Sequence, residues 1–167
     1  ITETRMLQME REQEQLIENR SLRAAICTAY PLIMSINLSQ NNYECFIQEK
    51  NIVRYDEKGR YDDMVDITMG RVYPSYQEDF GHRFSREALM RRYEEGEREL
   101  YMEMQMLGDD GEYHWISLYV IRVDNPYSDD MLVIGLMKVL DEQRAEKARQ
   151  ERLLRDALTS AEAANKA

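Results

Sequence analysis

The residues that could do chemistry in this chain are two histidines, two cysteines and a short acidic run. His82 follows Glu78 by four positions, so the pair would share a helical face and offer a metal ion at most two ligands. Asp109, Asp110 and Glu112 cluster as in a weak calcium loop, but a hairpin turn accounts for the same residues. We therefore expect no metal site.

Catalytic patterns are missing from the sequence, which contains no GxSxG, P-loop, HExxH or CxxC motif. Cys27 and Cys45 lie far apart in sequence, and we interpret them as reduced structural thiols rather than a disulfide. His82 and His114 are also far apart in sequence. We expect these 167 residues to catalyse no reaction of their own.

The charge balance excludes two classes of partner. A net charge of −10 and an isoelectric point near 4.8 disfavour nucleic acid and anionic membrane surfaces, which attract clustered Lys and Arg. The longest apolar run, residues 131–137, is too short to span a bilayer. We expect a cytoplasmic fragment of a longer protein, because the chain opens on Ile1 rather than Met; a membrane anchor outside the fragment stays open.

Residues 1–29 have the composition of a long helix, with many Glu, Gln and Arg and no Gly or Pro. Apolar residues fall at alternating spacings of three and four, with polar interruptions, as in a heptad seam. Met9 and Leu16 belong to this seam. Two interpretations remain open, a dimeric coiled coil and a helix packed on its own domain.

Residues 30–140 predict one α+β domain, a PAS-like five-stranded antiparallel sheet with short helices on one face. A turn is expected at 56–59, and Ser85 is placed to cap the second short helix. The expected strands lie within 31–39, 43–50, 99–107, 112–123 and 131–140, and the helices within 61–74 and 85–96.

The last two expected strands are apolar on both faces, so each face needs a cover. The short helices cover one face, and a flanking helix or a second subunit must cover the other; residues 1–29 are the first candidate. Two interpretations of the methionine-rich face at 102–106 remain, a packed core and the wall of a small-molecule pocket, because such faces occur in both. The pocket candidates are Met102, Met104, Ile116 and Leu118.

Residues 141–167 predict a second long helix that continues the last strand without a helix breaker. Its first half has polar seam positions, and its second half has small apolar ones. Such a seam is expected to form when two chains are held together elsewhere; the alternative is a solvated single helix that acts as a spacer. The expected dimer contacts are Met9, Leu16, Leu154, Leu158 and Ala161.

Five stretches, in this order, resemble a PAS domain with flanking signalling helices from bacterial sensor kinases. The likeness spans about residues 26–167, and Tyr73 stands where the family carries the histidine of a valine-histidine-proline-acidic turn. The last stretch resembles the segment that leads into the phosphoacceptor helix of hybrid histidine kinases. The stretches are AAICTAYPLIMSINLSQNNYE, VYPSYQEDFGHRFSREAL, DDGEYHWISLYVIRV, VIGLMKVLDEQRAEKA and RDALTSAEAANKA.

The resemblance implies a homodimeric sensory module of a two-component histidine kinase (a transferase), whose kinase domain follows residue 167 in the same chain. Asp141 starts the exit helix and would be either an ordinary cap or, if it bonds back to the domain, a signalling residue. The alternatives are a ligand-free dimerisation spacer and a module that feeds a diguanylate cyclase. A small α+β enzyme is the least supported alternative.

The resemblance gives no chromophore. Flavin-binding members carry a cysteine in an asparagine-cysteine-arginine motif, which does not occur here. Haem-binding members place a histidine on the long mid-domain helix, whereas His82 precedes the helix expected from Ser85. We expect no cofactor, and an unidentified small-molecule ligand stays open.

Overall fold

The computed structural model describes residues 2–48 and 52–166, and it is an α+β structure with a single antiparallel sheet. The described residues form five helices and six strands. In chain order they are α1 (Thr2–Ala29), β1 (Leu32–Asn37), β2 (Asn42–Gln48), β3 (Lys58–Arg60), α2 (Tyr61–Met69), α3 (Pro74–Phe84), α4 (Arg86–Glu94), β4 (Glu99–Leu107), β5 (Tyr113–Val123), β6 (Leu132–Val139) and α5 (Asp141–Lys166).

The sheet brings the two ends of the domain together at its centre. Its strand order is β3-β2-β1-β6-β5-β4, so the first strand after α1 lies beside the last strand before α5. Leu32 is paired with Met137, and the register continues to Asn37 and Leu132. The centre of the sheet therefore lies close to the end of α1 and the start of α5.

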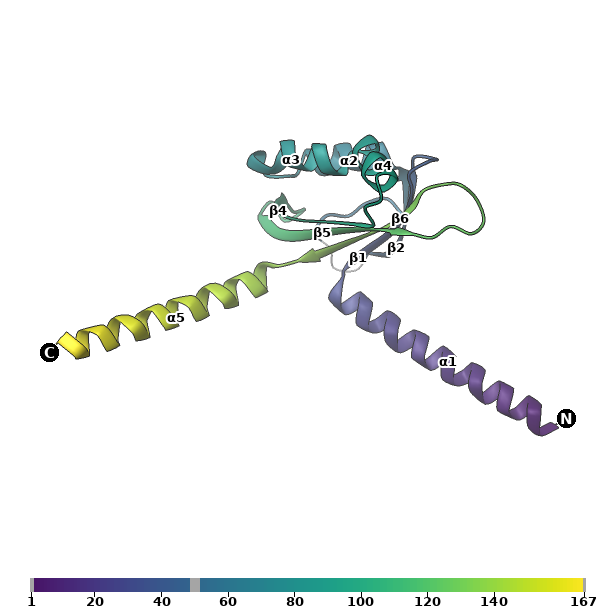
Figure 1. The fold of residues 1–167 in the computed structure, drawn as a ribbon, viewed down its shortest axis with the longest axis horizontal. Coiled ribbons are helices and arrows are strands. Elements are labelled where there is room, and N and C mark those ends of the chain that lie inside the picture. Colours follow the sequence, from purple (N-terminus) through teal and green to yellow (C-terminus); the bar gives the residue numbers. More distant parts are fainter. Residues whose placement is uncertain (1, 49–51, 167) are drawn as a thin grey trace.

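Helices α2, α3 and α4 form one layer over a single face of the sheet (Figure 1). Period-two alternation turns the apolar side chains of β4 toward this layer, because successive strand residues point to opposite faces. Met104 and Met106 are fully buried there, whereas Glu103 lies on the other face. Ser85 caps α4 as expected, since its hydroxyl accepts the Ala88 N–H at 3.2 Å.

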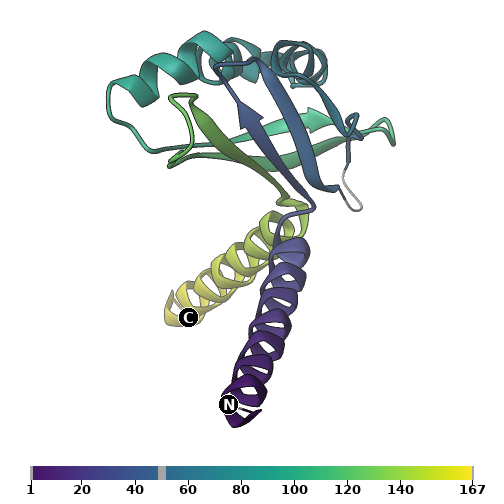
Figure 2. The ribbon, with the colours of Figure 1, turned by 90° about the vertical axis from the view of Figure 1, so that its right-hand side faces the viewer.

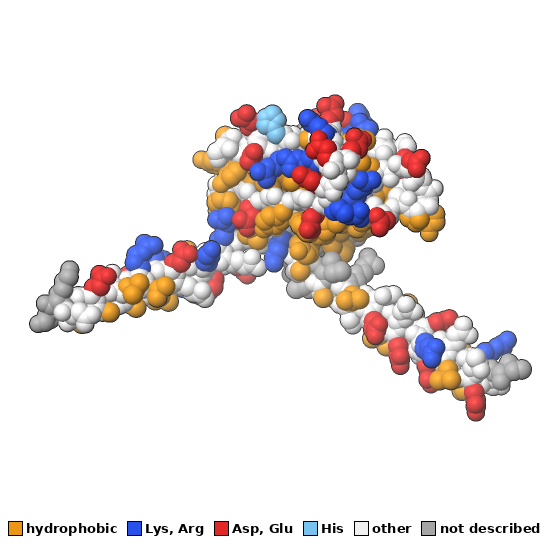
Figure 3. All heavy atoms as spheres, viewed as in Figure 1, with side chains coloured by type: hydrophobic (Ala, Val, Ile, Leu, Met, Phe, Trp, Pro, Cys, Tyr) orange, Lys and Arg blue, Asp and Glu red, His pale blue; other side chains and the backbone are white. Residues whose placement is uncertain are grey.

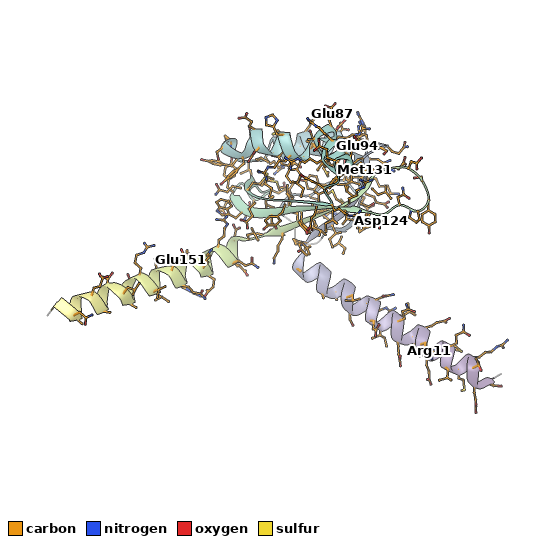
Figure 4. All side chains as sticks on the ribbon, in the orientation of Figure 1. Arg11, Glu87, Glu94, Asp124, Met131 and Glu151 are labelled. Atoms are coloured by element: carbon orange, nitrogen blue, oxygen red, sulfur yellow. The ribbon has the colours of Figure 1, made fainter. Side chains whose placement is uncertain are left out.

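The long helices α1 and α5 leave from the side of the sheet opposite that layer and extend away in diverging directions (Figures 1 and 2). Arg11 on α1 and Glu151 on α5 point into solvent (Figure 4). The expectation that the N-terminal helix covers the second sheet face is wrong for the single chain. On that face Phe46 is 55% exposed and Tyr101 is 50% exposed.

Two local predictions need correction. The turn expected at 56–59 overlaps the short edge strand β3 (Lys58–Arg60), which pairs with β2 through Gly59 and Tyr43. A Cβ at position 59 would lie 3.1 Å from the Tyr43 ring, so glycine permits this close pairing. The expected helices lay within 61–74 and 85–96, but residues 74–84 form a further helix, α3. Proline is tolerated at a helix start, where the missing N–H has no partner to lose.

None of the helices within 2–48 and 52–166 is both long enough and apolar enough to cross a lipid bilayer.

Candidate functional site

A narrow cavity of about 60 Å³ lies between the sheet and the helical layer. Strands β1, β5 and β6 form its floor, and α2 and α3 contribute aromatic walls that include Tyr61, Phe80 and Phe84. Gly135 on β6 leaves space at the cavity floor, because a Cβ there would lie 3.2 Å from Met34 Cγ and 3.4 Å from Ile36 Cδ1. The cavity is therefore bounded mostly by hydrocarbon.

The hydroxyl groups in the cavity wall are all hydrogen-bonded to protein groups. Tyr55 Oη lies 2.8 Å from Thr68 Oγ1, and Thr68 in turn donates to the carbonyl of Met64 at 2.9 Å. Tyr61 donates to the carbonyl of Phe84 at 2.5 Å. Burial raises the pKa of Tyr55 to about 12 and raises the pKa of Tyr61 further, so both phenols stay neutral. This wall matches a small, uncharged, apolar molecule.

The structure divides the predicted pocket residues. Leu118 lines the cavity. Met102, Met104 and Ile116 are buried in the same core but are not among the residues that line this cavity. The sequence analysis missed the helical wall and Gly135, because α3 was not expected and a glycine within a strand does not by itself indicate a cavity floor.

A second cluster joins α5 to the sheet. Asp141, the first residue of α5, turns its carboxylate back to β5 instead of capping its own helix. Its Oδ1 accepts the Trp115 backbone N–H at 2.8 Å, and its Oδ2 lies 2.6 Å from His114 Nδ1. The first helical turn is thus tied to β5 by two hydrogen bonds, in addition to the hydrogen bond that the Leu140 N–H donates to the carbonyl of Trp115 at 2.7 Å.

His114 also reaches the turn between β4 and β5. Its Nε2 lies 2.7 Å from Asp110 Oδ2, and the side chain is 17% exposed. Burial alone lowers the pKa of His114, but the hydrogen bonds that its ring makes to the carboxylates of Asp141 and Asp110 outweigh burial and raise that pKa above its ordinary value. The sequence analysis gave His114 no role, although an aspartate four positions earlier was an available signal.

Aromatic contacts connect the helical layer to α5. Tyr76 on α3 meets the Trp115 ring edge-on at 5.9 Å between centroids. The guanidinium of Arg144, in the first turn of α5, lies 3.5 Å from the centroid of the same ring. Since Phe80 lies one turn further along α3, the cavity wall and the exit helix are linked through Tyr76 and Trp115.

The remaining chemical candidates have structural partners. His82 lies within α3 rather than before a helix; its side chain is 75% exposed and pairs with Glu78 at 3.6 Å, so it does not face the cavity. Burial and then the charge of Glu57 raise the pKa of Cys45, which keeps its thiol protonated. Cys45 is a free cysteine, and the side chain of Cys27 lies outside the described residues.

Asp110, Glu112 and His114 form the one group of potential metal-ligating atoms found among the described residues, all within 4.8 Å of one another. Both ring nitrogens of His114 already face carboxylates of the protein, so the ring bridges two protein groups.

Comparison with solved structures identifies the fold. No protein-family model and no curated protein matches this sequence. A sensory box histidine kinase/response regulator from Burkholderia thailandensis aligns with a TM-score of 0.53 at 12% identity, over 83% of this chain and 98% of that chain. The chain has a PAS fold. The six-stranded sheet differs from the expected five strands only by the short edge strand β3.

Two further PAS structures align with lower scores. The N-terminal domain of a diguanylate cyclase with PAS/PAC sensor from Marinobacter aquaeolei has a TM-score of 0.48 at 19% identity, over 68% of this chain and 97% of that chain. The PAS domain of a protein from Colwellia psychrerythraea has a TM-score of 0.47 at 15% identity, over 76% of this chain and 98% of that chain.

The PAS fold places both clusters on one strand. Leu118 of β5 lines the cavity on the helical side, and Trp115, three residues earlier, binds Asp141 through its backbone. The same strand therefore contacts both the cavity and the first turn of α5.

Proposed function

We propose that this PAS module senses a signal and passes it through α5 to an effector domain of the same protein. The observation that carries the proposal is the attachment of Asp141 to β5, a strand that also lines the cavity. Packed elements with two discrete arrangements transmit signals in this way, and a helix held by a few polar contacts has a low barrier to repositioning. The module itself catalyses no reaction.

A histidine kinase is the effector we favour. The stretch RDALTSAEAANKA at the end of α5 resembles the lead into a phosphoacceptor helix, which supports a kinase domain in the same chain. A diguanylate cyclase is the alternative effector. The protein sequence that the gene encodes after residue 167 would distinguish a histidine kinase from a diguanylate cyclase. In either case we place the module in the cytoplasm.

The ligand we propose is small, uncharged and apolar, since the cavity holds only about 60 Å³ and its hydroxyl groups are satisfied by the protein. A ligand-free dimerisation spacer remains the competing function. Native mass spectrometry of the protein as purified separates the two, because a retained ligand adds mass to each chain.

Filling the cavity tests the sensor directly. In Gly135→Ala the new methyl group occupies the cavity floor against flexible atoms of Met34 and Ile36, so we expect a folded protein with a stability loss of about 1–3 kcal/mol. The full-length protein should then lose its ligand-dependent change in effector activity. The matched control is Gly70→Ala, whose Cβ would meet only ordinary contacts at 3.6 and 3.8 Å. An unchanged effector response in Gly135→Ala would favour the spacer.

We further propose that the module forms a homodimer through α1 and α5. All five predicted contact residues are exposed in the single chain, and the exposed leucines and methionines lie along two helices that project away from the domain (Figure 3). Exposed apolar residues at heptad spacing favour burial against a second helix.

Charge placed on the seam tests the dimer. Replacing Leu16, Leu154 and Leu158 by Glu should convert the dimer to a monomer in analytical ultracentrifugation, because like charges would face each other across the seam. Glu at Leu7, Ile17 and Leu153, which are equally exposed but are not among the predicted dimer contacts, is the control and should leave a dimer. A wild-type monomer, or equal effects of both triple variants, would refute the seam.

A further inference from the structure

We propose that His114 is a proton-responsive clamp. It fixes the first turn of α5 to the β4–β5 turn when both ring nitrogens carry protons, and one of its two carboxylate contacts opens when the ring loses a proton. The clamp consists of Asp110, His114 and Asp141. It concerns how α5 is attached, and it holds whether or not the cavity takes a ligand.

The geometry requires a doubly protonated ring. Nδ1 lies 2.6 Å from a carboxylate oxygen of Asp141, and Nε2 lies 2.7 Å from one of Asp110. A carboxylate is an acceptor, so both ring nitrogens must donate, and only the imidazolium form of histidine has two donors. Both contacts are charge-assisted and short, as expected for an ion pair on each side.

Neither carboxylate can turn away to accommodate a neutral ring. Each one uses its second oxygen on a backbone N–H: Asp110 Oδ1 accepts from Glu112 at 3.0 Å, and Asp141 Oδ1 accepts from Trp115 at 2.8 Å. When the ring loses a proton, one nitrogen presents a lone pair to an oxygen less than 3 Å away. One contact of the clamp must then open.

The β4–β5 turn is a firm anchor for the clamp. Asp109 pairs with Arg71 at 2.9 Å, and its carboxylate also accepts the Arg54 backbone N–H at 3.2 Å. Gly108 permits the tight turn, because a Cβ there would lie 2.7 Å from Asp110 Oδ1 and 3.0 Å from the His114 ring. Loss of the clamp is therefore expected to move α5 rather than the turn.

The charges around His114 favour its protonated form. Asp110 and Glu112 face it from the turn, and Asp141 faces it from α5. The nearby cations have other partners, since Arg71 pairs with Asp109 and Arg144 lies over the Trp115 ring.

The sign of the effect follows from the raised pKa of His114. The clamp is fully formed below the ordinary histidine pKa of about 6.5 and is lost as the pH rises through the higher pKa of the folded state. Alkaline conditions should loosen α5, and mild acid should hold it.

Hydrogen exchange on the 167-residue chain, measured with and without a chelator and together with an NMR titration of both histidines, tests the clamp. The readout is the protection factor of amides in the first turn of α5, such as the Arg144 N–H that bonds Leu140. We expect protection to fall as the pH rises from below the ordinary histidine pKa of about 6.5 through the higher pKa of His114 in the folded chain, by about tenfold for each tenfold gain in the proton affinity of the ring on folding.

Variants separate the clamp from general effects of pH. His114→Gln should remove the pH dependence and leave protection at the wild-type alkaline level, whereas His82→Gln, in an exposed pair with Glu78, should behave as wild type. Asp110→Asn, on the exposed turn, should lower the His114 pKa and weaken the pH response of the protection factor. This variant replaces His114→Gln as the test if His114→Gln does not fold.

Three results would overturn the clamp: wild-type protection that does not change with pH, a response retained in His114→Gln, or a response that appears only without chelator, which would assign the site to a metal ion. A pH response in exchange with unchanged effector output would instead count against the proposed output role of α5 and leave the clamp standing.

Discussion

Alanine in place of Asp141 should free the first turn of α5 and reduce the effector's response to its signal by about tenfold or more in the full-length protein. The substitution removes the acceptor for the Trp115 N–H and the partner of His114 Nδ1 at once. Hydrogen bonds that involve a charged group contribute about 1.5–3 kcal/mol each, and 1.4 kcal/mol corresponds to a factor of ten in an equilibrium.

The matched control for Asp141→Ala is Asp141→Asn. Asparagine keeps an oxygen that can accept the Trp115 N–H but loses the negative charge beside His114. We expect an intermediate response in Asp141→Asn and a His114 pKa closer to its ordinary value, both measurable in one preparation by NMR and by an effector assay. A full response in Asp141→Ala, with the fold intact by circular dichroism, would remove Asp141 from the signalling route.

The largest loss of stability is expected for Met104→Ala. The Met104 side chain is 0% exposed at the centre of the core beneath the helical layer. Truncation of a buried methionine to alanine costs about 2–5 kcal/mol, which is a large share of the roughly 5–15 kcal/mol that stabilises a typical domain. Urea unfolding should therefore show a much lower midpoint with little change in slope.

Met104→Leu serves as the control, since a swap that preserves volume costs less than about 1.5 kcal/mol. Because Met104 does not line the cavity, the free energy of unfolding should fall in Met104→Ala without a change in ligand mass per folded chain. Retention of full stability in Met104→Ala would mean that the core beneath β4 is more loosely packed than the structure has it.

Periodicity in the sequence determined most of the elements. Period-two alternation in the segments of β1, β2 and β4 predicted strands at those places, and the run without Gly or Pro after Leu140 predicted α5. Ser85 marked the start of α4 through its own side chain, which caps the helix as expected. These features depend on residues close in sequence, so a local pattern is sufficient to predict them.

The site was decided by the tertiary structure. Edge strand β3 exists because β2 pairs with it, and the cavity exists because Phe80 and Phe84 of α3 stand opposite Gly135 of β6. His114 and Asp141 carry no shared motif; β5 and β6 pair antiparallel, which brings the start of β5 beside the start of α5 and places the ring against the carboxylate. Contacts between residues far apart in sequence leave no periodic signal, so the sequence by itself determined the PAS-like order of elements, and only the packing of the sheet decided which side chains meet.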